Sequence, residues 1–434
     1  MNVEKTRHLC MLPWVHATLD PHGTFSVCCH AWDSLPGQSL LGTTLREARN
    51  AEPLREMRLT MKADRPSPHC HHCYRNEALG LPSPRTLANA RFGKFADLIE
   101  RTRDDGHIGN GLRSLDLRLS NVCNLRCRTC GPHASTTWYA DARALGEAVP
   151  PAPARLFKLN PELEVELAAA LPRIQLLYFA GGEPLLDDAH YRLLDSLLAQ
   201  GRADVLLDYN TNLTRLACGR REILPLWSRF ESVKVGASVD GAGAAFNYLR
   251  KGADWEQVVA NFDRIRREAP LVVLYLHVSV SVLNAFHLPD AIDEWLRLGM
   301  IQWPDQLVLN FVRQPAHFDV AVLDATERRA LRARYTAYLA ELAPRTHRIL
   351  HLTIERAFKA ILGAVERPPG QDRRRLRARF REVTRSLDRR RGERLTAVFP
   401  ELGRLMREPG PRRRSHQDKA AVTVATDGVS SPLS

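Results

Sequence analysis

The chain lacks the long apolar stretch of a membrane-spanning protein, because no apolar run approaches the ~20 residues that a helix needs to cross a bilayer. It has no secretory start and only nine cysteines in 434 residues, which argues against an extracellular disulfide scaffold. In its arginine-rich carboxyl-terminal part, Phe380 and Phe399 are the aromatic residues, too few to support stacking on nucleic-acid bases. We therefore expect a cytoplasmic protein with no membrane partner and no nucleic-acid partner.

Positive charge is in excess: 62 Lys and Arg face 49 Asp and Glu, a net charge of +13. Much of this excess lies between Arg373 and Arg414. Such a run favours an acidic partner, either a peptide leader or nucleic acid, but a solvated helix face is the simpler explanation.

From Leu112 onward, apolar strand candidates alternate with amphipathic helical stretches, which is the pattern of a parallel sheet with right-handed crossovers. Six strands are too few to close an eight-stranded barrel, so we expect an α/β fold with an open, partial (β/α)6 TIM-like barrel. The expected strands are Leu112–Leu119, Ile174–Ala180, Val205–Thr211, Ser232–Val239, Val272–Leu283 and Gln306–Val312.

Changes of composition divide the chain into five parts. Residues 1–84 are rich in Cys, His and Pro and have trouble building a core without a metal. Residues 85–110 are expected to be a helical linker, 111–320 the barrel, 321–408 a basic helical extension, and 409–434 a disordered tail.

Eight residues carry the strongest chemical signal, Cys123-Asn-Leu-Arg-Cys127-Arg-Thr-Cys130, directly after the first barrel strand. Three thiols at this spacing cannot all form disulfides, but they can converge on an iron–sulfur cluster. Three ligands for four irons leave one iron open to a substrate. Zinc and buried thiols are the alternatives.

Other polar motifs follow the later strands. Gly181-Gly182-Glu183-Pro184 follows the second strand, Asn212 the third, Ser238-Val-Asp240-Gly241 the fourth and Asn284 the fifth. Active sites of parallel α/β folds form at the carboxyl ends of the strands, so these residues are expected to meet. Taken alone, each motif could be an ordinary turn.

These motifs resemble the radical S-adenosylmethionine (radical SAM) superfamily over about residues 112–315, through Cys123, Cys127, Cys130 and Gly181–Pro184. The resemblance implies an enzyme with a [4Fe–4S] cluster that binds S-adenosylmethionine at its open iron. The position before the last cluster cysteine is often aromatic in that family, and here it is Thr129.

The resemblance also assigns roles to the residues that would bind S-adenosylmethionine. Gly181 and Gly182 let backbone oxygens approach its ammonium group, and Glu183 adds a carboxylate there. Ser238 and Arg250 would hold the methionine carboxylate. Asn212 and Asn284 would hold the ribose or the adenine.

A second group of cysteines, Cys10, Cys28-Cys29, Cys70 and Cys73, resembles the auxiliary-cluster module called twitch, a shortened SPASM domain. The resemblance implies a second [4Fe–4S] cluster ligated by Cys10, Cys28, Cys70 and Cys73, with Cys29 able to replace Cys28. Four thiolate ligands would suit this cluster to electron transfer. Because several histidines are near and C-x2-C is a common zinc motif, structural zinc is the alternative.

Cys218 stands apart from both groups, in a loop after the third strand. A thiol near a radical site could return a hydrogen atom to a substrate radical, but a half-buried structural cysteine is the simpler interpretation.

The leading hypothesis is a radical SAM enzyme that acts on a peptide, with an electron donor such as flavodoxin or ferredoxin. An epimerase or dehydrogenase of an aminoglycoside-type sugar is the second hypothesis. A non-catalytic zinc- or cluster-bearing nucleic-acid-binding protein is the third.

Overall fold

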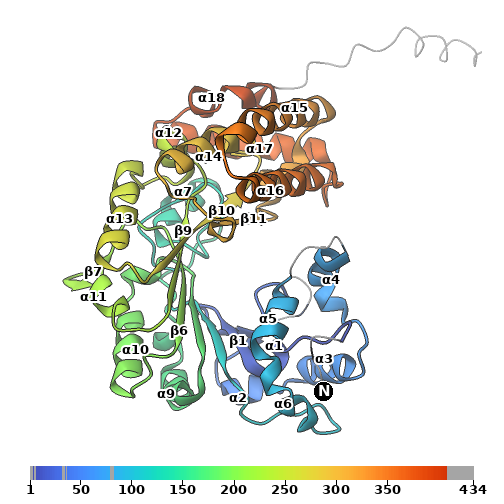
Figure 1. The fold of residues 1–434 in the computed structure, drawn as a ribbon, viewed down its shortest axis with the longest axis vertical. Coiled ribbons are helices and arrows are strands. Elements are labelled where there is room, and N and C mark those ends of the chain that lie inside the picture. The colour runs from blue at the N-terminus through green and yellow to red at the C-terminus, as the bar shows by residue number, and fades with distance from the viewer. Residues whose placement is uncertain (1–2, 4–5, 32–34, 36, 79–82, 408–434) are drawn as a thin grey trace, which may run out of the picture.

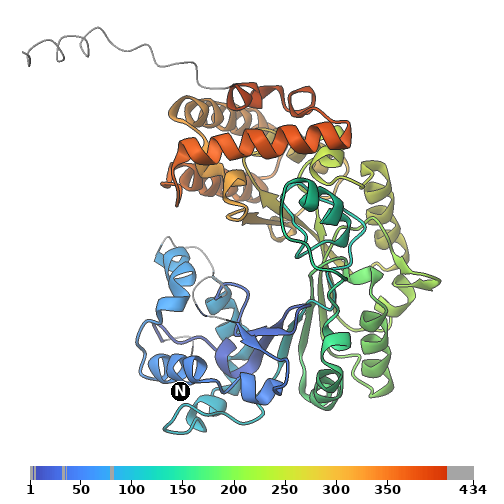
Figure 2. The same ribbon diagram turned by 180° about the vertical axis from the view of Figure 1, so that it is seen from behind.

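One curved sheet organises the described chain, which in this computed structural model comprises residues 3, 6–31, 35, 37–78 and 83–407. The sheet has nine strands in the order β11-β10-β9-β6-β5-β4-β1-β2-β3. Figures 1 and 2 show the amino-terminal elements at one end of this sheet and the carboxyl-terminal helices at the other, on the same side of it. The expected tail, 409–434, lies outside the described residues.

Six of the strands form the expected partial barrel. Neighbours among them pair in parallel, for example Asp116 with Tyr178 and Asn210 with Gly236. Each strand falls within or beside its expected range, so the (β/α)6 prediction is confirmed. The strands are β4 (Ser114–Leu117), β5 (Leu176–Phe179), β6 (Leu206–Thr211), β9 (Val233–Ser238), β10 (Val273–Val280) and β11 (Leu307–Phe311).

Helices fill the connections between these strands, and Figure 1 shows α10, α11 and α13 along one face of the sheet. They are amphipathic, as in α13, where Val258, Phe262 and Ile265 are buried at helical spacing. The connecting helices are α7 (Tyr139–Ala144), α8 (Leu156–Leu159), α9 (Pro161–Ala170), α10 (Asp188–Ala199), α11 (Leu224–Trp227), α12 (Gly243–Leu249), α13 (Trp255–Glu268) and α14 (Leu288–Arg297).

Alternation along the strands separates a helix-covered face from a concave face. In β10, Leu274, Leu276, Val278 and Val280 are buried, whereas the intervening positions 275, 277 and 279 are half-buried and polar. Because side chains alternate between the two faces of a strand, the polar set lies on the concave face. That face is the interior of the partial barrel.

The amino-terminal residues continue the barrel sheet, which the sequence did not predict. Strand β1 pairs in parallel with β4, with Thr18 opposite Asp116, and then turns back into β2 and β3. The apolar side chains of this segment, including Trp14 and Leu19, belong to the same core as the barrel. The elements are α1 (Leu12–Val15), β1 (His16–Leu19), β2 (Thr24–Ser26), β3 (Gln38–Ser39), α2 (Leu45–Ala48), α3 (Glu52–Lys62) and α4 (His71–Ala78).

The segment expected as a linker, 85–110, contains α5 (Pro84–Phe92) and α6 (Asp97–Glu100) and packs on the amino-terminal elements. The Trp14 indole N–H donates to the Thr102 hydroxyl at 2.8 Å, and the buried Arg58 donates to the Gly106 carbonyl at 2.8 Å. These contacts tie the segment to the elements that precede it.

Three long helices follow the barrel, as the sequence predicted: α15 (Ala325–Leu342), α16 (Arg348–Glu366) and α17 (Arg373–Arg391). The short helices α18 (Leu395–Val398) and α19 (Gly403–Met406) come after them. Several arginines of the basic run are not available to an acidic partner, since Arg377 pairs with Glu327 and the buried Arg391 pairs with Asp141. This part of the run stabilises the fold.

Among the described residues, no helix is both long enough and apolar enough to cross a membrane.

Because β1 covers the edge of β4, the barrel is not expected to fold without the amino-terminal segment. A fragment that starts at residue 111 would expose β4 as an edge strand and remove the apolar side chains packed on it. We expect this fragment to aggregate and to lack a cooperative thermal transition, measured by size-exclusion chromatography and circular dichroism. A monodisperse fragment with a cooperative transition would contradict the shared core.

Candidate functional site

The three cysteines of the first motif lie together at the carboxyl end of β4. All three thiols are free; Cys127 is buried, and Cys123 and Cys130 are half-buried. A hydrogen bond from Cys130, followed by the Arg250 guanidinium, lowers the pKa of Cys127. Burial, followed by the neighbouring Cys127, raises the pKa of Cys123 to about 12. The three thiols are therefore electrostatic neighbours, as ligands of one cluster must be.

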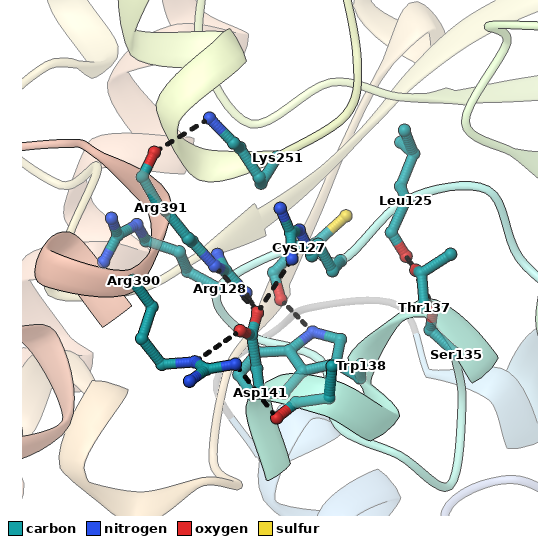
Figure 3. A network of polar contacts seen from close by, with 12 residues as sticks. Leu125, Cys127, Arg128, Ser135, Thr137, Trp138, Asp141, Lys251, Arg390 and Arg391 are labelled. Atoms are coloured by element: carbon teal, nitrogen blue, oxygen red, sulfur yellow. Dashed lines mark hydrogen bonds and ion pairs between the residues drawn. The ribbon is translucent and has the colours of Figure 1, made fainter. Parts of the chain in front are cut away.

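Hydrogen bonds fix the backbone of the loop that carries these cysteines. The hydroxyls of Ser135 and Thr137 donate to the Leu125 carbonyl at 2.5 and 2.6 Å, and the Trp138 indole donates to the Cys127 carbonyl at 2.7 Å (Figure 3). The loop carbonyls are therefore satisfied from a single neighbouring segment, which holds the loop in one conformation.

The two glycines of the second motif pack against this cysteine loop. Gly182 donates its N–H to the Ser120 carbonyl at 2.9 Å, and Glu183 donates to the Val122 carbonyl at 2.8 Å. Gly181 has φ +110°, and a Cβ on Gly182 would collide with the Val122 carbonyl. Only glycine fits this contact, so the motif at β5 and the loop at β4 are built as one unit.

Glu183 is buried inside this unit. Its carboxylate accepts hydrogen bonds from the Thr211 hydroxyl at 2.7 Å and the Asn212 N–H at 2.8 Å. Burial raises the pKa of Glu183 to about 7 despite these donors. The carboxylate thus lies beside the cysteine loop, in surroundings that would favour a cationic ligand group.

Asn212 supports the cysteine loop directly. Its amide N–H group donates to the Asn124 side chain at 2.9 Å and to the Cys123 sulfur at 3.8 Å, while its carbonyl accepts from the Thr214 hydroxyl at 2.6 Å. With these bonds in place, the Asn212 side chain is a brace for the loop, and its expected contact with ribose or adenine stays a prediction.

Arg250 lies on the other side of the cysteines. It pairs with Asp240 at 2.9 Å and donates to the Cys127 sulfur at 3.8 Å, and its Nε is buried with no hydrogen-bond partner in the described part of the chain. Ser238, the last residue of β9, is half-buried. Arg250 therefore contacts Cys127 and keeps one unused N–H donor. Its expected contact with the methionine carboxylate requires such a donor.

Asn284 is fully buried and completely engaged. Its amide donates to the carbonyls of Asp240 and Ser279 at 2.9 and 3.1 Å and accepts from the Ser281 N–H at 2.8 Å. It therefore fixes the loop that carries Asp240. A direct contact with ribose or adenine would require these bonds to break.

Cys218 belongs to a different structural element from the cysteine loop. It lies in the short strand β7 (Ala217–Cys218), paired with β8 (Arg221–Glu222) in a separate two-stranded sheet. Burial, followed by Asp188 and Asp187, raises its pKa. Its expected role as a hydrogen donor stays a prediction.

The amino-terminal thiols also come together. Burial, followed by the neighbouring Cys70 and Cys73, raises the pKa of Cys10. Burial, followed by Cys29, Cys10 and Cys70, raises the pKa of Cys28. Cys29 has partly different surroundings: desolvation, followed by the Asp116 carboxylate, raises its pKa to about 11, and Cys73 also contributes. Cys28 is thus the member of the pair that adjoins Cys10 and Cys70.

No three His, Cys, Asp or Glu side chains among the described residues form a ready-made site for a single metal ion.

Sequence reasoning missed the polar residues on the concave face of the sheet. Asp116, Tyr178 and Asp208 lie side by side on β4, β5 and β6, and the Tyr275 hydroxyl donates to Asp208 at 3.1 Å. Gly236 makes this possible, since a Cβ there would lie 2.7 Å from the Tyr275 ring. Burial raises the pKa of both aspartates. The available signal was a polar residue at every second position of an apolar strand.

Comparison with known proteins agrees with the motif. Residues 117–294 match the family model described as the Radical SAM superfamily. No curated protein matches the chain.

Similar solved structures are distant in sequence. One is native anSMEcpe with bound AdoMet and Cp18Cys peptide, with 18% identity and a TM-score of 0.34, covering 53% of this chain and 58% of that one. Another is Streptococcus suis SuiB bound to S-adenosylmethionine, with 12% identity and a TM-score of 0.35, covering 63% and 58%. The chain therefore spans less than two thirds of these two structures.

The contact between Gly182 and the cysteine loop can be tested by adding one methyl group. In Gly182→Ala, the Cβ would push the loop away from β5 and displace Cys123, so reconstituted protein is expected to retain much less iron. Overpacking should also lower the free energy of unfolding by about 1–3 kcal/mol. Iron and sulfide per chain and thermal unfolding are the measurements.

Gly363→Ala in α16 is the matched control, because nothing lies within 4 Å of its Cβ position. It should keep the wild-type iron content and gain up to about 1 kcal/mol of stability from better helix propensity. Full iron retention by Gly182→Ala would show that the close packing is unimportant for the loop.

Proposed function

Residues 117–294 are a domain of the radical SAM superfamily, and on that premise we propose that this chain is an enzyme that cleaves S-adenosylmethionine reductively. The observation that carries the proposal is the unit formed by the cysteine loop and Gly181–Glu183. Three free thiols, a glycine-lined carboxylate and a spare donor on Arg250 fit a [4Fe–4S] cluster with an amino-acid ligand at its open iron.

The chemistry that this cluster supplies when bound is one-electron cleavage of S-adenosylmethionine to methionine and a 5′-deoxyadenosyl radical, which takes hydrogen from a substrate. Cys123, Cys127 and Cys130 hold the cluster. Glu183 orients the ammonium end of the methionine moiety, and Arg250 with Ser238 holds its carboxylate end. The parallel strands around the site restrict the access of water to the radical.

A peptide is the proposed substrate class. The concave face offers polar and ionisable side chains that lie side by side on neighbouring strands, including Asp116, Tyr178 and Asp208. Among the described strands, β11 ends the sheet, so no further strand pairs with its outer edge, where an extended chain could add. An aminoglycoside-type sugar is the competing substrate, because acidic side chains on the concave face would also accept its amines.

A second [4Fe–4S] cluster is proposed in the amino-terminal segment, on Cys10, Cys28, Cys70 and Cys73. Support comes from the neighbouring thiols that raise the pKa values of these cysteines: Cys70 and Cys73 act on Cys10, and Cys10 and Cys70 act on Cys28. A low-potential donor such as flavodoxin or ferredoxin would supply electrons. A cytoplasmic location stays a prediction.

Anaerobic reconstitution with iron and sulfide tests the enzymatic proposal. With dithionite, the wild-type protein is expected to convert S-adenosylmethionine to 5′-deoxyadenosine and methionine, detected by chromatography. Cys123→Ala/Cys127→Ala/Cys130→Ala should abolish both products, because no ligands remain in the loop. Loaded wild-type protein that forms neither product would refute the proposed activity.

Iron content tests the second cluster. We expect about eight irons per chain in wild-type protein and about four in Cys28→Ser, whereas Cys29→Ser, which changes the adjacent thiol, should keep about eight. About four irons and one zinc in wild-type protein would identify the amino-terminal site as structural zinc. A loss in Cys29→Ser alone would exchange the roles of the two cysteines.

A further inference from the structure

The cysteine loop is also held by the carboxyl-terminal extension, outside the matched domain. Two backbone bonds first join the loop to the segment after α12: the Arg126 N–H donates to the Lys251 carbonyl at 2.9 Å, and the Arg128 N–H donates to the Leu249 carbonyl at 2.8 Å. Lys251 in turn pairs with Glu393, just beyond the end of α17, at 2.9 Å. Residues 249–251 thus lie between the cysteine loop and the end of α17, and the three segments form one contact.

Arg128, between two cluster cysteines, is the first anchor of this contact. Its guanidinium is fully buried and pairs with Asp388 at 2.6 Å and with Glu393 at 2.7 Å. It also lies 3.6 Å from the centre of the Tyr248 ring, and the Tyr248 hydroxyl donates to Asp388 at 2.8 Å. A buried guanidinium with two carboxylates and an aromatic face is held in a single position.

Asp141 is the second anchor. It is 1% exposed and pairs with Arg391 at 2.9 Å, with Arg390 at 3.2 Å and with Arg126 at 3.6 Å. Figure 3 shows Arg390 and Arg391 directed at this carboxylate from α17, beside Trp138. The Arg391 guanidinium lies 5.0 Å from the centre of the Trp138 ring, whose N–H donates to the Cys127 carbonyl. The Trp138 side chain therefore lies between the Arg391 guanidinium and the Cys127 backbone.

Positive charge predominates around the loop. Among the described residues around the loop, five carboxylates, which are Asp141, Glu183, Asp240, Asp388 and Glu393, face six cationic groups, which are Arg126, Arg128, Arg250, Lys251, Arg390 and Arg391. Nitrogens of Arg128, Arg250 and Arg391 are buried with no hydrogen-bond partner in the described chain. Solvent and salt screen buried charges poorly, so the excess positive charge acts on any group that the three cysteines bind.

We propose that Arg391 is a positioning residue of α17 that raises the reduction potential of the cluster held by Cys123, Cys127 and Cys130. This inference rests on the proposed function. Three thiolates outweigh the positive charge of a [4Fe–4S] core, and reduction by one electron from a low-potential donor adds a further negative charge. A nearby buried cation stabilises the reduced state more than the oxidised state, while Glu393 opposes it.

The test is a potentiometric titration of reconstituted protein with dithionite, followed by electron paramagnetic resonance. The signal that changes on addition of S-adenosylmethionine identifies the cluster in the cysteine loop. We expect Arg391→Gln to shift its midpoint to more negative values and Arg391→Lys to keep it near the wild-type value. Arg389→Gln is the matched control, because it removes the same charge from an exposed position on the same helical turn.

A second variant separates charge from loosened structure. Glu393→Gln removes a carboxylate from the same contact, so it should shift the midpoint in the opposite direction, to less negative values. This result shows whether charge in this contact reaches the cluster, even if Arg391→Gln fails to retain its cluster, because loosened structure alone predicts no shift to less negative values.

Unchanged midpoints in Arg391→Gln or Glu393→Gln, at full iron content, would overturn the inference. That outcome differs from failure of the proposed function, in which reconstituted wild-type protein shows no signal that responds to S-adenosylmethionine.

Discussion

The backbone hydrogen bonds of the cysteine loop are the constraint on which the rest of the site depends. The loop carries three ionisable thiols, and burying them is favourable only when a cluster is bound. Hydrogen bonds from neighbouring segments must therefore fix the backbone conformation of the loop. Gly182 and Glu183 hold its start, and residues 249–251 hold its centre. These partners follow different barrel strands. The loops at the carboxyl ends of the strands are therefore hydrogen-bonded to one another and do not adopt their conformations independently.

The period-two and period-3.6 patterns predicted six strands and the long helices well, because each of those elements buries one continuous apolar face. The amino-terminal strands were missed for a physical reason. They span two to four residues, and the first of them, β1, is stabilised by pairing with β4, a partner about a hundred positions later. No local periodicity reports such pairing, since its energy comes from residues distant in the sequence.

The candidate site, like the fold, could be predicted only in part from the sequence. Positions at strand ends predicted which residues gather there, and Cys123, Cys127, Cys130, Glu183 and Arg250 do gather. Side-chain direction could not be predicted in this way. The side chains of Asn212 and Asn284 bond to neighbouring loops and brace them, and the arginines at the end of α17 point inward at Asp141. Both outcomes satisfy buried polar groups, which sequence position alone cannot assign.

The contact between α17 and the cysteine loop has a consequence for biosynthesis. A ribosome makes residues 123–130 early, but the groups that complete their surroundings, Asp388 to Glu393, emerge more than two hundred residues later. Until then Arg128 lacks both of its carboxylate partners, and Asp141 lacks the two arginines of α17. The buried ion pairs beside the loop can therefore form only in a nearly complete polypeptide.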